Sequence, residues 1–304
     1  MIKKYAKYYF AVLILGVVFL SSLYAYAPYF VVEVKNPLIM TAKELMEDGN
    51  RENGLHKKSD FYFTANDGIS INVRFSPSSK KKTRGNIILL HGIRSDKNSL
   101  SDREKYFNKQ GFNTFAMDLR GHGKSGGEYC TYGYKEKEDV KKLVDYLSQK
   151  NQPDLPLGIY GHSLGGAVAI QALAIDKRID FGIIESTYSD FTKITSDYSE
   201  YYTGLRFESL HADLLERSGE LAGFVYDKVN PKDYCSLISQ PVLMVHGAED
   251  EKIKPSYALE NYKRLPSLKK DIYIVPKAHH NDIWQIGGNK YHEKILQFIS
   301  GLSY

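Results

Sequence analysis

Cysteine is scarce in this sequence, which has two among its 304 residues, Cys130 and Cys235. So few thiols exclude a disulfide-rich scaffold and a cysteine-based metal site, both of which need more cysteines at regular spacing. Whether the two cysteines pair is open from sequence alone, although two free thiols are the favoured state. Histidine and acidic residues show no metal-ligand spacing either. We therefore expect no metal and no cofactor.

A clustered basic surface is also missing. The formal net charge is +5, but residues 1–35 contribute four lysines against one glutamate, which leaves only +2 for the other 269 residues. A nucleic-acid-binding protein would need a concentrated patch of lysine and arginine, so we exclude a nucleic-acid partner. Hydrophobic residues make up 42% of the chain, which is enough for the core of one large domain with an insertion.

Residues 1–32 form a long apolar segment behind a basic start. About 20 apolar residues suffice to cross a bilayer as a helix, and a retained single-pass anchor competes here with a cleaved signal sequence. Pro28 directly follows the small-x-small site Ala25-Tyr26-Ala27 and should hinder cleavage, so we favour the anchor. Lysines before the segment place its start in the cytoplasm and the rest of the chain outside it. Secretion or release to a periplasm after cleavage is the alternative.

Residues 33–60 are polar and predict a linker, and a strand–helix alternation begins at residue 61. Asn66-Asp67-Gly68 separates the first two predicted strands as a hairpin turn. Apolar runs and helical periodicity then alternate to the end of the chain. The predicted strands span residues 61–65, 69–75, 86–91, 113–119, 157–161, 180–185, 241–246 and 271–275. The predicted helices span 100–110, about 140–147, 164–175, 256–265 and 290–299. This order predicts an α/β fold with a mostly parallel sheet and helices on both faces.

Residues 186–240 interrupt the alternation with about 55 tyrosine-rich, helix-like residues. A structureless loop of that length is improbable inside a compact domain. We predict that this stretch forms a small helical cap over the candidate functional site whose residues are described next. The cap is inserted into a domain that spans residues 61–304.

The segment Gly161-His162-Ser163-Leu164-Gly165 follows an apolar strand and opens an alanine-rich helix. This is the context of the G-x-S-x-G nucleophile elbow. Its glycines keep Cβ atoms out of a crowded strand–helix crossing. The helix N-terminus behind Ser163 directs free backbone N–H groups toward a developing negative charge. A glycine-rich turn with an incidental serine is the bland interpretation, and the flanking strand and helix argue against it.

A serine nucleophile needs a histidine base and a carboxylate that orients it, and in this architecture both follow late strands. Glu249, Asp250 and Glu251 follow one such strand, and His279 and His280 follow the next. Spacing alone does not choose between the two histidines or among the acids.

The ordered motifs resemble the α/β-hydrolase superfamily, and within it the serine aminopeptidase-like or Bem46-like branch, which includes membrane-anchored ABHD-type enzymes. The resemblance covers about residues 61–300. It rests on His91-Gly92, Asp118-Leu119-Arg120-Gly121-His122-Gly123-Lys124-Ser125, Gly161-His162-Ser163-Leu164-Gly165, His246-Gly247-x-x-Asp250 and His280-Asn281-Asp282. It implies Ser163, Asp250 and His280 as a catalytic triad, with His280 favoured over His279. It also implies an oxyanion hole built from the backbone N–H groups of Ile93 and Leu164, although relatives carry a small residue at the position of Ile93.

The resemblance implies a serine hydrolase that cleaves a carboxylic ester or acyl thioester through an acyl-enzyme. The apolar N-terminus and the aromatic cap make a lipid-like acyl group a reasonable substrate. A peptidase acting on short peptides is the alternative, with Glu185, Glu200, Glu208 and Glu216 as candidates to read a peptide terminus. A non-catalytic binding protein with the same fold is less favoured because all three triad members are present. The expected partners are a small acyl or peptide substrate and a membrane.

Overall fold

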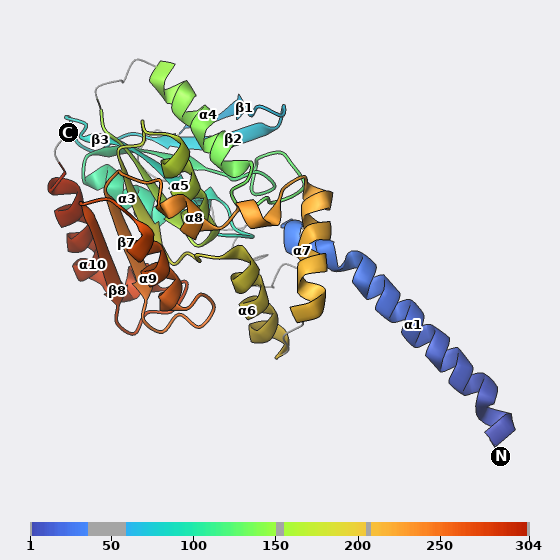
Figure 1. The fold of residues 1–304 in the computed structure, drawn as a ribbon. Coiled ribbons are helices and arrows are strands. Elements are labelled where there is room, and N and C mark those ends of the chain that lie inside the picture. The colour runs from blue at the N-terminus through green and yellow to red at the C-terminus, as the bar shows by residue number, and fades with distance from the viewer. Residues whose placement is uncertain (1, 36–58, 150–154, 205–207, 303–304) are drawn as a thin grey trace.

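A central sheet organises the computed structural model, which describes residues 2–35, 59–149, 155–204 and 208–302 (Figure 1). The strands are β1 (Ser59–Thr64), β2 (Ser70–Ser76), β3 (Gly85–Leu90), β4 (Phe112–Met117), β5 (Leu157–His162), β6 (Phe181–Glu185), β7 (Val242–Gly247) and β8 (Lys270–Val275). Their order across the sheet is β1-β2-β4-β3-β5-β6-β7-β8. The β1–β2 and β2–β4 pairs are antiparallel, and every other pair is parallel.

Helices cover both faces of this sheet. In chain order, the helices of the described residues, on the sheet or beside it, are α1 (Ile2–Val32), α3 (Ser101–Lys109), α4 (Glu136–Gln149), α5 (Leu164–Ile175), α6 (Phe191–Thr203), α7 (Glu208–Ala222), α8 (Pro231–Cys235), α9 (Pro255–Arg264) and α10 (Ile283–Ser300), with short 3-10 helices η1 (Lys97–Leu100) and η2 (Tyr226–Lys228). All residues of β3, β4 and β7 are buried, as expected for strands covered on two sides. The predicted α/β architecture is confirmed.

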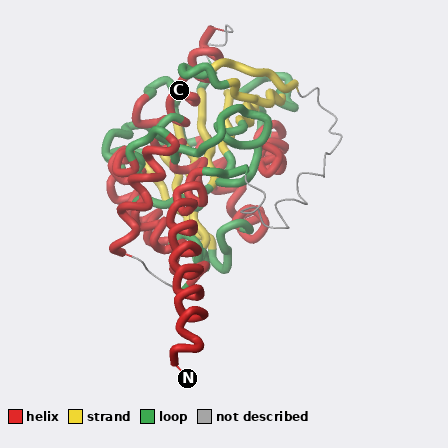
Figure 2. Tube along the Cα trace, turned by 90° about the vertical axis from the view of Figure 1, so that its right-hand side faces the viewer, coloured by secondary structure: helices red, strands yellow, loops and turns green. Residues whose placement is uncertain are grey.

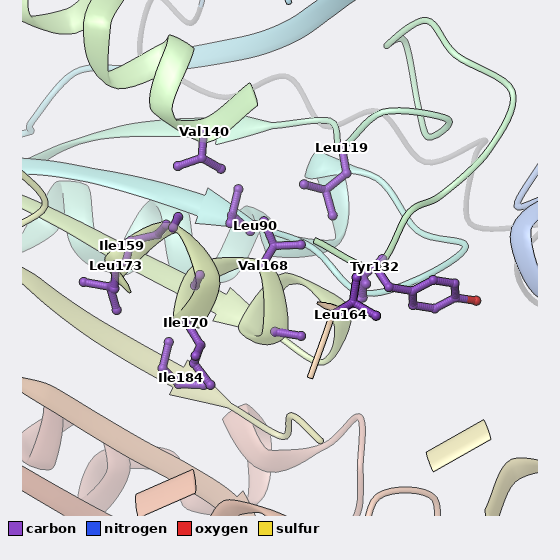
Figure 3. Packing of buried hydrophobic residues seen from close by; sticks show 14 of the residues in the cluster. Leu90, Leu119, Tyr132, Val140, Ile159, Leu164, Val168, Ile170, Leu173 and Ile184 are labelled. Carbon is purple, nitrogen blue, oxygen red and sulfur yellow. The ribbon is translucent and has the colours of Figure 1, made fainter. Parts of the chain in front are cut away.

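Two hydrophobic clusters lie on opposite faces of the sheet. Successive residues of a strand point to opposite faces, and in β3 Ile88 and Leu90 join the cluster under α4 and α5. Ile87 and Leu89 join the cluster under α3 and α10 instead. Figure 3 shows the first cluster, where side chains of α5 interleave with those of the strands. Burial of both faces of the sheet holds the carboxyl ends of the strands in place, and these ends carry the residues of the candidate active site.

The stretch between β6 and β7 contains α6, α7, η2 and α8. Figure 1 shows α6 and α7 beside the body, on the side from which α1 projects, whereas α8 packs against α5 and α9. The last helix of the inserted stretch therefore belongs to the body. The cap boundaries at residues 186–240 and its role stay a prediction.

Helix α1 projects from the body for most of its length (Figure 1), and in the view of Figure 2 it lies in front of the body. Within it, residues Leu13–Val32 have a mean hydropathy of 1.7 and are long and apolar enough to cross a membrane. An anchor and a signal sequence both meet that description. The end of α1 is different, because Val32 and Val34 are 0% and 2% exposed within the core. The first residues of the predicted linker thus pack on the body, and residues 36–58 lie outside the described residues.

Candidate active site

Ser163 lies in the sharp turn between β5 and α5, with φ 56° and ψ −117°. A non-glycine residue with positive φ is strained, and such strain persists only where the surroundings enforce it. The two glycines of the turn show what enforces it. A Cβ built on Gly161 would lie 2.1 Å from the carbonyl oxygen of Gly165, and one on Gly165 would lie 2.2 Å from that of Leu90. Only glycine fits at these crossings, and the turn presents Ser163 at the N-terminus of α5.

His280 and Asp250 meet Ser163 from two other loops at the carboxyl end of the sheet. His280 Nε2 is 3.1 Å from Ser163 Oγ, and His280 Nδ1 is 2.8 Å from Asp250 Oδ2. Asp250 follows β7 and His280 follows β8. The exposed fractions of Ser163, His280 and Asp250 are 5%, 8% and 3%. The structure thus brings together the three residues that the sequence predicted as a unit.

Asp250 is surrounded by donors. Its Oδ1 accepts hydrogen bonds from the backbone N–H groups of Ile253 at 2.9 Å and Lys252 at 3.1 Å, and His246 Nε2 lies 3.3 Å from Oδ2. Burial raises the pKa of Asp250, but hydrogen bonds from His246 and His280 outweigh burial and hold that pKa well below its usual range. Asp250 is therefore a carboxylate that accepts the Nδ1–H of His280, which leaves Nε2 free to accept a proton from Ser163.

His279 points elsewhere. Its side chain is 55% exposed, and its Nδ1 lies 2.7 Å from the carbonyl oxygen of Glu249. It is His280 that hydrogen-bonds Ser163. The neighbouring carboxylate of Glu249 is 56% exposed, at 3.7 Å from His279 Nε2.

The loop after β3 lies beside Ser163 and carries the predicted oxyanion donor Ile93. A Cβ built on Gly92 would be 3.4 Å from Ser163 Cβ, so the two backbones are close. No hydrogen bond among the described residues uses the backbone N–H of Ile93 or Leu164. His91 shapes this loop. Its Nε2 accepts from the backbone N–H of Leu119 at 3.1 Å, so its Nδ1 carries the hydrogen donated to the carbonyl of Gly92 at 2.7 Å.

Sequence reasoning missed a buried charged network beneath the triad. Glu185, at the end of β6, is 0% exposed and accepts hydrogen bonds from Arg103 Nη2 at 3.0 Å and Tyr291 Oη at 2.8 Å. His162 Nδ1 is also 3.0 Å from Glu185, and the His162 ring centre lies 5.3 Å from that of His280. Burial raises the pKa of Glu185, but Arg103 and His162 lower it below its usual range. Glu185 is thus not available to read a peptide terminus.

Replacing Arg103 by leucine should lower the free energy of unfolding by about 3–5 kcal/mol, since it leaves the charge of Glu185 buried without its partner. Urea denaturation measures the effect. Arg264→Leu is the control, because Arg264 is 45% exposed and lies 3.9 Å from its acidic partners. Exposed ion pairs contribute at most about 1 kcal/mol. Equal losses in both variants would show that the buried pair has no special weight.

The remaining motif residues brace the loops around the site. Asp118 accepts from Lys97 Nζ at 2.6 Å and from the backbone N–H of Lys124 at 2.9 Å. Arg120 makes two hydrogen bonds to Asp139, at 2.6 and 2.7 Å. Within the described residues no group of His, Cys, Asp or Glu is arranged to hold a metal ion. Cys130 and Cys235 are both buried and free.

Comparison with known proteins finds similar sequences and similar folds. A family model described as "Serine aminopeptidase, S33" matches residues 81–188. The chain is 24% identical over 238 residues to YqkD of Bacillus subtilis, which covers 73% of each chain. It is 26% identical over 198 residues to Bem46 of Schizosaccharomyces pombe, which covers 64% of this chain and 60% of the relative. The Pyrococcus furiosus esterase Pf2001 superposes with a TM-score of 0.67 at 24% identity, which covers 83% of this chain and 96% of the esterase. These likenesses confirm the expected fold.

Proposed function

We propose that this chain is an α/β hydrolase of the Bem46-like branch and a serine hydrolase that cleaves carboxylic esters or acyl thioesters through an acyl-enzyme on Ser163; its likeness to the S33 family model and to YqkD and Bem46 supports the proposal. One observation carries the proposal, the unbroken line of hydrogen-bonding contacts from Ser163 Oγ to His280 and on to Asp250. A serine hydroxyl is a weak nucleophile until such a base takes its proton.

In the proposed reaction, His280 Nε2 takes the proton of Ser163 as Oγ attacks the carbonyl carbon. The oxyanion accepts hydrogen bonds from the N–H groups of Ile93 and Leu164, with the N-terminus of α5 behind them. His280 Nε2–H then protonates the leaving alcohol or thiol as the acyl bond breaks. Water attacks the acyl-enzyme with His280 again as the base. Asp250 keeps the hydrogen on Nδ1 and stabilises the charged imidazole.

We expect kcat/KM to fall in acid with a midpoint below pH 6.5. Burial lowers the pKa of His280 from its ordinary value of 6.5, and Asp250 only partly opposes burial. His280 accepts a proton only when neutral, so activity is full above its pKa and is lost as the pH falls through it. The pH dependence of kcat/KM for a soluble ester reports this pKa in the free enzyme. An acid limb centred above pH 6.5 would argue against His280 as the base.

An apolar acyl group suits the surroundings of the serine. Leu164 and Tyr132 belong to the same buried hydrophobic cluster (Figure 3), and the Tyr132 ring centre is 4.3 Å from that of Phe191 in α6. Phe191 is in turn 6.1 Å from Phe224. These contacts join the predicted cap to the body through aromatic side chains, which favours a lipid-like ester or thioester over a charged substrate.

A peptidase acting on short peptides is the second candidate, and the description of the matching family model favours it. Of the acidic residues proposed to read a peptide terminus, Glu200 and Glu216 are exposed on α6 and α7. The side chain of Glu208 lies outside the described residues.

A substrate panel tests both candidates with one enzyme preparation. Nitrophenyl esters and acyl thioesters of increasing chain length should be cleaved, and aminoacyl amides should not. Labelling by a fluorophosphonate probe, run in parallel, reports whether an activated serine is present. Absence of both labelling and turnover would overturn the proposal. Labelling with turnover of the amides alone would favour the peptidase.

We further propose that α1 is a single-pass anchor and that the hydrolase domain lies outside the cytoplasm, because lysines precede the apolar segment and cytoplasmic flanks are rich in them. Proteolysis of intact cells or spheroplasts should digest the domain. Digestion only after the cytosol is released would contradict this orientation. Recovery of the domain without α1 in the medium or periplasm would instead identify a cleaved signal.

A further inference from the structure

We infer that residues 29–35 at the end of α1, here called the docked segment, are a positioning element of the active site. The docked segment holds the loop that carries Ile93, and it does so through Arg94. The inference rests on the proposed function, since it assigns the docked segment to the oxyanion side of that same site.

The docked segment is built into the body. Val32 and Val34 are buried in the larger hydrophobic cluster, and Cys130 donates its backbone N–H to the carbonyl of Val32 at 2.9 Å. Glu33 forms an antiparallel bridge with Tyr129, and Tyr132 Oη donates to the carbonyl of Val31. Backbone hydrogen bonds and apolar burial therefore fix this stretch of chain against the loop that precedes α4.

Arg94 connects the docked segment to the loop that follows β3 and carries Ile93, here called the oxyanion loop. It directly follows Ile93, and its Nη2 donates to the backbone carbonyl of Phe30 at 2.9 Å. Its φ is 54°, a left-handed conformation that is unfavourable for an arginine unless contacts hold it. The contact with Phe30 is one that holds it.

The oxyanion loop is thus secured on both sides of Ile93. On one side, His91 holds the carbonyl of Gly92. On the other side, Arg94 ties the loop to the docked segment. An oxyanion donor must lie within about 2.7–3.1 Å of where the negative charge develops, and displacement of reacting groups by about 1 Å can cost about 100-fold in rate. Loss of the Arg94 contact should therefore act on the chemical step.

Helix α1 also contacts the predicted cap. Tyr24 Oη donates to Asp213 Oδ2 of α7 at 2.7 Å, and the Arg217 guanidinium lies 4.0 Å from the centre of the Tyr24 ring. Cleavage after Ala27 would remove Tyr24 but leave residues 29–35 in place. The role of the docked segment is therefore independent of whether α1 is an anchor or a signal.

Steady-state kinetics of full-length variants on a soluble nitrophenyl ester tests the inference. Arg94→Met should lower kcat about 10- to 100-fold, below the full effect of deleting an oxyanion donor, with KM within about threefold of wild type and little change in Tm. Arg94→Lys, which keeps a cationic donor, should recover part of kcat. Arg94→Gly removes the same contact but relieves the left-handed strain, so its kcat should fall even though its stability does not. Arg264→Met is the matched control and should leave kcat unchanged.

The docked segment can be perturbed from its other side, without touching Arg94. Replacing Val32 and Val34 together by alanine should also lower kcat, whereas alanine at Leu15 and Val17, which are 68% and 57% exposed, should not. Normal kcat in both Arg94→Met and the double valine variant would overturn the inference, as would an effect on KM alone. Wild type that is neither labelled by a fluorophosphonate nor active would instead mean that the proposed function itself is wrong.

Discussion

Replacing Ser163 by alanine should lower kcat by at least about 10⁴-fold, the scale of loss when the nucleophile of a serine triad is removed. The reason is geometric, because Oγ is the atom that His280 faces at 3.1 Å, and alanine removes it. Residual turnover should not exceed what the oxyanion donors and substrate binding provide on their own. Initial rates with a nitrophenyl ester measure the effect, and fluorophosphonate labelling should disappear in the same variant.

Ser186 provides an unusually close control. It follows β6, the neighbour of β5 in the sheet, and its φ of 53° nearly equals the 56° of Ser163. Its Oγ is buried without a hydrogen-bond partner among the described residues, so Ser186→Ala removes no such contact. Activity and labelling should persist in Ser186→Ala. Labelling that persists in Ser163→Ala would identify another nucleophile.

The adjacent histidines should respond in opposite ways. His280→Ala should lose about 10⁴-fold or more in kcat because, among the described residues, His280 is the one base that hydrogen-bonds the Ser163 hydroxyl. His279→Ala should stay within a few-fold of wild type. His279 is the natural control, since it neighbours His280 in sequence but is exposed and contacts Glu249. Kinetics at one pH above 6.5 suffices for the comparison. Equal losses in the two variants would remove the basis for assigning His280.

Local patterns were enough to predict the sheet and the serine. Each strand of the described sheet lies within two residues of its predicted bounds. Apolar runs mark the parallel strands, and the turn Asn66-Asp67-Gly68 marks the antiparallel pair β1 and β2. Helix α10 was predicted to begin at residue 290 and instead begins at Ile283. Its early part contains Gly287 and Gly288, which lower helix propensity. Gly288 has φ 45°, so the chain kinks there and resumes the helix.

Long-range pairings were beyond the reach of local patterns. Arg103 and Glu185 are 82 positions apart, and nothing in the sequence around either residue indicates that burial makes them partners. The choice of Asp250 and His280 depended on family resemblance, because three acids and two histidines stand at the right strand ends. The docked segment was not predicted either, because its partners are also distant in sequence. Val32 ends the apolar segment and Val34 stands at the start of the predicted linker, and their partners come from the loop that precedes α4, about 100 residues later in the chain.

The burial of residues 32 and 34 changes what kind of attachment α1 provides. Residues 36–58 join the docked segment to β1. Because the docked segment and β1 both belong to the body, residues 36–58 are not a linker between the bilayer and the enzyme. If α1 lies in a membrane, the helix is joined directly to the body, with no flexible linker between them. Transmembrane helices tilt to match bilayer thickness. A body that is joined directly to such a helix must tilt together with it. The distance of Ser163 from the lipid surface and the orientation of its site would then depend on the thickness of the membrane that holds α1.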